Sequence, residues 1–189
     1  MSTPSPRITV ALPEAVTVAL YLRDAYELMV ERDIPPLNPR VNVSPHPTAF
    51  DEDESLREWS TYWKHISEFE SNRVLVARKH LLFDQAQYPQ LAALSAPLQH
   101  EMLEFATKRK RESAKVARER SSNSPESKVV SQSRFRLFKS RRKVSLAVIL
   151  LPVDQEFVRI VGPDRVLVGI PTYLDSTKYE STLRAALNG

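Results

Sequence analysis

Residues 144–153 read VSLAVILLPV, which is the longest apolar run in the chain. A membrane span needs about twenty apolar residues, so this run is too short to cross a bilayer. A short apolar run rich in β-branched residues is typical of a buried β-strand. Two similar stretches follow, EFVRIV at 156–161 and RVLVGI at 165–170, and Gly-Pro-Asp at 162–164 predicts a tight turn between them.

A closing helix is predicted after these strands. Thr177 and Glu180 have the spacing of a capping box, in which a hydroxyl and a carboxylate satisfy free amides at a helix start. Tyr179, Leu183 and Leu187 would share one face of this helix. The carboxyl-terminal part of the chain is therefore predicted to be a small β-β-β-α unit.

The part of the chain before the strands has helical periodicity. Residues 12–33 predict a helix that begins near Pro13 and ends near Asp33, because the prolines that follow cannot continue it. Residues 34–50 read as an extended, proline-rich connection. Residues 51–83 give the clearest helical pattern. Its apolar stripe consists of Leu56, Trp59, Trp63, Ile66, Phe69, Val76 and Phe83.

A further helix is predicted from about Ser95, and it continues into residues 108–120, KRKRESAKVARER, without a helix breaker. Residues 121–133, SSNSPESKVVSQS, contain six serines and a proline, a composition typical of a flexible linker. We therefore expect an α+β protein in three parts. These are a mainly helical body (1–120), a flexible, serine-rich basic linker (121–143) and the small β-rich unit with its closing helix (144–189).

Charge is strongly segregated along the chain. The formal net charge is only +4, but residues 107–143 contain fourteen Lys and Arg and three Glu. The rest of the chain contains thirteen basic and twenty acidic residues, so an acidic body carries a basic belt at 108–143. A concentrated positive segment of this kind favours partners that are polyanions.

We expect the basic belt to bind nucleic acid with low sequence specificity, because Lys and Arg neutralise phosphates and aromatic rings stack on bases. An anionic membrane surface, which attracts the same charges, and a purely solvated helix end and linker are the alternatives. The candidate residues are Lys108, Arg109, Lys110, Arg111, Lys115, Arg118, Arg120, Arg134, Phe135, Arg136, Phe138, Lys139, Arg141, Arg142 and Lys143.

A competing hypothesis is a protein-interaction or oligomerisation module in which the belt is incidental. Trp59, Tyr62 and Trp63 lie close together in the sequence, and large aromatic side chains are good anchors for a protein partner or a second copy of the chain. Aromatic residues at helical spacing are also typical of a core. Phosphates on Ser113, Ser124 or Ser145 would reduce the local positive charge, although these serines equally fit unmodified linker and strand positions.

The sequence favours a protein that is not an enzyme and needs no cofactor or metal. Only three glycines occur, and neither the P-loop pattern nor the dinucleotide-binding glycine pattern is present. The chain has no cysteine, which excludes disulfides and thiolate metal ligands and fits an intracellular, cytoplasmic or nuclear protein. His100 and Glu101 match the start of the H-E-x-x-H motif, which binds zinc, but Glu104 stands where the second histidine would be.

Overall fold

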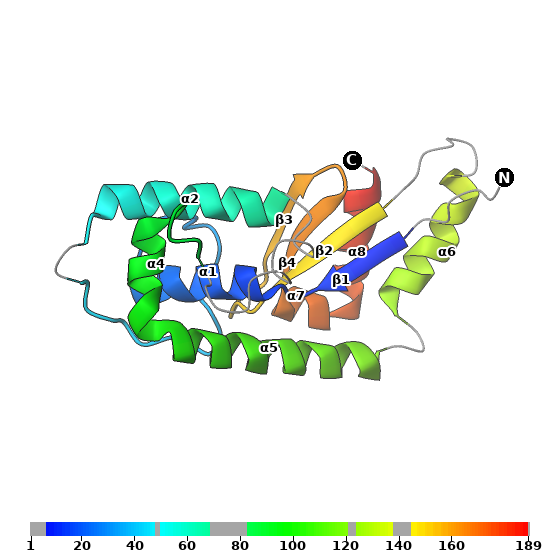
Figure 1. Cartoon of the computed structure of the whole chain (residues 1–189). Helices are drawn as coiled ribbons and strands as arrows, with labels where there is room; N and C mark the ends of the chain where they lie inside the picture. The colour runs from blue at the N-terminus through cyan, green and yellow to red at the C-terminus, as the bar shows by residue number, and fades with distance from the viewer. Residues whose placement is uncertain (1–6, 48–49, 69–82, 121–123, 138–144, 189) are drawn as a thin grey trace.

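The computed structural model describes residues 7–47, 50–68, 83–120, 124–137 and 145–188. A four-stranded mixed sheet lies at one end of the molecule, and helices extend from it (Figure 1). The α+β class expected from the sequence is therefore confirmed. Within the described residues, no helix is long and apolar enough to cross a membrane.

The sheet has the strand order β1-β2-β4-β3. Its strands are β1 (Arg7–Ala11), β2 (Ser145–Leu151), β3 (Val158–Gly162) and β4 (Arg165–Gly169). β2 pairs in parallel with both β1 and β4, whereas β3 and β4 form an antiparallel pair. The three strands predicted near the carboxyl end are therefore present, and β1, which the sequence did not predict, forms the fourth.

Helices cover both faces of the sheet, which explains why the central strands are continuously apolar. Leu146, Val148 and Leu150 of β2 belong to one core cluster, together with side chains of the carboxyl-terminal helices. Ile149 and Leu151 belong to a second cluster, which is formed mainly by the amino-terminal helices. Alternate residues of one strand therefore join two different cores.

The first helix, α1 (Glu14–Ala25), is shorter than predicted. It ends at Ala25, eight residues before the predicted end at Asp33, and the buried Arg23 side chain holds the next loop in place. Arg23 donates hydrogen bonds to the backbone oxygens of Ile34 (3.0 Å) and Pro35 (2.9 Å). Glu27 and Glu31 in this loop have positive φ values of 50° and 46°, which a continuing α-helix cannot accommodate.

The second helix, α2 (Glu52–Glu68), confirms the start of the long amphipathic helix. Trp59, Trp63 and Ile66 of its predicted stripe are buried, and so is Phe83. Phe69 and Val76 lie outside the described residues. A short helix, α4 (Pro89–Ser95), and a 3₁₀ turn (Ala96–Leu98) lead into α5 (Gln99–Glu119), so the prediction of a long helix that ends in the basic motif is correct.

The segment expected to be a flexible linker contains a helix, α6 (Pro125–Leu137). The Ser124 side chain caps this helix by accepting the amide of Ser127 (3.3 Å), and Pro125 takes the first helical position. Val129 is buried against the carboxyl-terminal core cluster. The prediction of a linker is therefore wrong for residues 125–137, because one buried valine and a good amino-terminal cap outweigh the serine-rich composition.

The chain closes with α7 (Ile170–Leu174) and α8 (Ser176–Asn188). The closing helix was predicted, but its cap differs from the predicted one. Asp175 Oδ1 accepts the amides of Thr177 (3.0 Å) and Lys178 (3.1 Å), and Glu180 pairs with Arg184. The helix therefore starts at Ser176, two residues earlier than a Thr177 cap would require.

The packing does not follow the predicted boundaries at residues 120 and 144. β1, from the amino-terminal body, pairs with β2 from the carboxyl-terminal unit. One core cluster joins residues of α1, α2, α4 and α5 with Ile149, Val153 and Leu167. The helical body and the β-rich unit therefore share a core.

Candidate nucleic-acid interface

The basic motif lies on α5, which runs along one side of the molecule (Figure 1). Met102 and Ala106 are buried on its inner face, and α5 packs against α1. Val116, nearer the carboxyl end, packs against the other core cluster, and the outer face of α5 presents basic residues to solvent. The structure divides these residues into two groups, which differ in what their charges contact.

Three basic residues, Arg109, Lys110 and Arg120, form contacts with other groups of the protein. Arg109 forms a two-point ion pair with Glu112, at 2.9 Å for each nitrogen–oxygen pair, and its guanidinium lies 5.5 Å from the Phe105 ring centroid. Lys110 pairs with Glu14 of α1 at 2.8 Å. These contacts offset the charges of both residues, so they add little to the attraction for an external polyanion.

Arg120, at the carboxyl end of α5, joins that helix to the end of the chain. Its guanidinium donates hydrogen bonds to the Tyr173 backbone oxygen and to Ser176 Oγ (2.8 Å). The same group lies 4.6 Å from the Tyr173 ring centroid and 5.8 Å from the Tyr179 ring centroid. Burial raises the pKa of both tyrosines, so these rings stay neutral and present their faces to the cation.

Arg120→Ala is expected to lower the free energy of unfolding by about 1–3 kcal/mol, because it removes two charge-assisted hydrogen bonds and two cation–π contacts. Lys115→Ala, an exposed change of the same charge on the same helix, should alter stability by less than about 0.5 kcal/mol. Urea unfolding of both variants tests this difference. Equal stabilities would mean that Arg120 is free in solution.

The second group is a basic stripe, which we define as Lys108, Arg111, Lys115 and Arg118. All four residues are exposed, and they follow one another at intervals of three, four and three residues. This spacing places them on one face of the helix, opposite the buried Met102 and Ala106. Within the part of the chain that the structure describes, none of the four side chains makes a hydrogen bond or ion pair.

The second basic block is only partly described. Arg134, Phe135 and Arg136 lie within the bounds of α6. Phe138, Lys139, Arg141, Arg142 and Lys143 lie outside the described residues. Of the three serines considered for phosphorylation, Ser113 donates to the Lys110 backbone oxygen (3.0 Å), Ser124 caps α6 and Ser145 is the first residue of β2.

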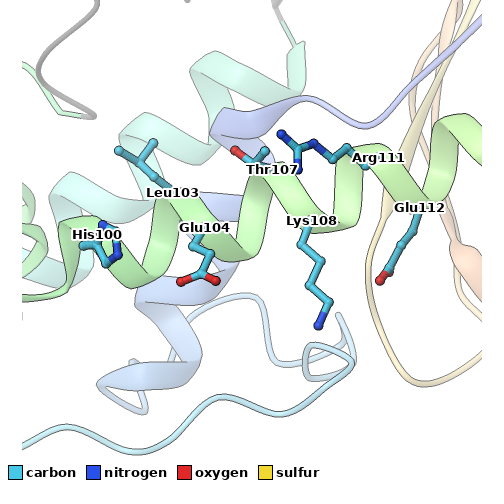
Figure 2. Close-up of a pocket in the computed structure, with 7 residues that line it drawn as sticks. All are labelled: His100, Leu103, Glu104, Thr107, Lys108, Arg111 and Glu112. Carbon is cyan, nitrogen blue, oxygen red and sulfur yellow. The ribbon is translucent and has the colours of Figure 1, made fainter.

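A shallow open depression of about 520 Å³ borders the start of the basic stripe (Figure 2). The α5 residues that line it are His100, Leu103, Glu104, Thr107, Lys108, Arg111 and Glu112. His100 and Glu104 project from the same side of the helix (Figure 2). In the described ranges, no group of three or more histidine or acidic side chains is placed to hold a metal ion.

The aromatic residues considered as partner anchors are core residues. Trp59, Tyr62 and Trp63 have exposed fractions of 0%, 6% and 3%. The two indole rings stack with centroids 5.1 Å apart, and the Trp59 indole donates a hydrogen bond to the Ala19 backbone oxygen (2.8 Å). Their burial assigns these three side chains to the packing of α2 against α1.

The structure contains a pocket that the sequence did not indicate, at the carboxyl ends of β2 and β4. We call it the strand-end pocket, and its volume is about 300 Å³. It is lined by Asn38, by one flank of α5, by residues 152–153 and by α7. These segments are far apart in the chain, so no local motif could have revealed the pocket. In mixed sheets, the carboxyl ends of parallel strands are a common place for ligands.

Comparison of the chain with protein-family models, curated proteins and solved structures found no match. A function must therefore be argued from the surfaces of this chain itself.

Proposed function

We propose that this protein binds nucleic acid, with little sequence specificity, through the basic stripe on α5. The observation that carries the proposal is the set of four exposed cations on one helical face with no acidic partner among the described residues. Unpaired surface cations beside one another create a positive potential that a polyanion can offset by contact.

The length of the stripe suits a phosphate backbone. Ten residues separate Lys108 from Arg118, which corresponds to about 15 Å along a helix axis. Each DNA strand has a phosphate about every 3.4 Å of axis, so the stripe spans about four phosphates of one strand. Lys and Arg contacts to phosphates carry no direct sequence information, which supports low specificity.

The test neutralises the stripe by changing Lys108, Arg111, Lys115 and Arg118 to Gln. Four phosphate contacts should give a slope of about −3 to −4 when the logarithm of the duplex-DNA binding constant is plotted against that of the salt concentration. Affinity should then fall roughly a hundredfold between about 50 mM and about 200 mM salt. The variant should lose most of this slope and most of its affinity at low salt.

A matched control changes four exposed cations outside α5, namely Arg7, Arg32, Arg57 and Lys64, to Gln. It alters the net charge equally, so an equal loss of binding would mean that overall charge, and not the stripe, attracts DNA.

Vesicles with anionic lipids should be tested beside DNA at the same salt concentrations. Stripe-dependent binding to vesicles without binding to DNA or RNA would contradict the proposal.

A further inference from the structure

The strand-end pocket lies on the flank of α5 next to the basic stripe. Its walls are mainly apolar and include Val116, Val153, Ile170 and Leu174. Arg109, Glu112 and Asn38 supply polar groups at its border. Leu174 has an exposed fraction of 52% and forms an exposed apolar edge of the pocket.

The charges at the pocket favour a neutral ligand group. The Arg109 side chain has an exposed fraction of only 15%, and the Glu112 carboxylate lies 2.9 Å from two of its guanidinium nitrogens. This ion pair leaves little net charge to attract a free anion. Hydrogen-bonding groups beside apolar walls instead suit a flat, neutral group with polar edges, and about 300 Å³ is at the lower limit for ligand pockets.

The same helix supplies both the pocket wall and the phosphate-binding stripe. Glu112 lines the pocket, whereas Lys115, three residues later, belongs to the stripe. Residues three apart on a helix have Cβ atoms about 5–6 Å from each other. A nucleotide whose phosphate contacts Lys115 can therefore place its base near the mouth of the pocket.

We propose that the strand-end pocket receives one unpaired base of a nucleic acid whose phosphates lie on the basic stripe. This inference rests on the proposed function and adds a preference for single strands. In a duplex the bases are stacked and paired, and turning one of them out costs free energy that a single strand does not pay.

The test compares single-stranded DNA, duplex DNA of the same length, and a single strand with abasic positions in its middle. Leu174→Ala removes an exposed part of the pocket wall, and Ile160→Ala on β3 is the matched control because Ile160 has a similar exposed fraction, 53%. The intact protein should bind the single strand about fivefold or more tightly than the abasic strand. Leu174→Ala should abolish this difference and leave duplex binding unchanged, whereas Ile160→Ala should change neither.

The outcomes separate the two proposals. If binding depends on salt and on the stripe, but the abasic strand binds as well as the intact one, the pocket does not receive a base and the proposed function stands. If Leu174→Ala weakens single-strand and duplex binding equally, the pocket inference is also wrong. If neither form of DNA binds at low salt, the proposed function fails, and the pocket inference fails with it.

Discussion

Replacing Trp59 with alanine is expected to lower the free energy of unfolding by about 3–5 kcal/mol, the range for a large aromatic side chain removed from a core. Trp59 is fully buried and stacks on Trp63. Its removal would leave a cavity between α1 and α2 and deprive the Ala19 backbone oxygen of its indole donor. Because most domains are stable by about 5–15 kcal/mol, this is a large share of the total.

Urea unfolding followed by far-ultraviolet circular dichroism would measure the effect. Trp59→Phe keeps most of the ring but not the indole donor, so it should fall between the alanine variant and the unmodified protein. Leu103→Ala, at a partly exposed position of α5, should change stability by less than about 0.5 kcal/mol. A stable Trp59→Ala protein that had lost a protein partner would instead show that this aromatic cluster is an exposed anchor.

The elements that could be predicted from sequence are those with a strong local pattern. The apolar, β-branched runs predict β2, β3 and β4, and the spacing of Trp59, Trp63 and Ile66 predicts α2. The absence of a breaker after Met102 correctly predicts that α5 continues into the basic motif. In each case the period of buried residues matches the element that forms.

β1 and α6 were missed because their stability depends on distant parts of the chain. β1 has five residues, and the strand that it pairs with lies far away in the sequence. Arg7 of β1 is paired with Ser145 of β2. A short edge strand of this kind has little signal of its own. α6 has a serine-rich sequence, but the Ser124 cap followed by Pro125 is a recognisable helix start, and it was the available signal.

The location of the candidate site could be predicted from charge, but its working residues could not. Composition locates the belt. Contacts with distant segments then occupy two of its residues, because Lys110 pairs with Glu14 and Arg120 donates to the Tyr173 backbone oxygen. The exposed stripe emerges only after these contacts are known. The strand-end pocket depends even more on tertiary structure, because four separate segments line it.

Glu58→Ala is expected to destabilise the protein by about 2–4 kcal/mol, because one buried and one partly buried amide would lose their acceptor. Glu58 lies on α2, is 6% exposed, and accepts the amides of Gln90 (3.2 Å) and Leu91 (3.0 Å). Pro89, the first residue of α4, has no amide hydrogen, and Tyr88 offers no side-chain cap. The carboxylate therefore caps α4 from another helix, where its negative charge also suits the helix dipole.

The loss should be concentrated in α4, since a helix of seven residues has little stability without its cap and packing. Hydrogen exchange should therefore show faster exchange of the α4 amides in Glu58→Ala, together with a lower urea midpoint. Glu54→Ala, on the exposed side of the same helix, removes only a surface pair with Arg57 and should cost less than about 1 kcal/mol. Glu58→Gln keeps one acceptor oxygen without the charge and should lie between the two. If Glu58→Ala and Glu54→Ala were equally stable, the start of α4 would be held by its apolar contacts alone, and the carboxylate would not be its cap.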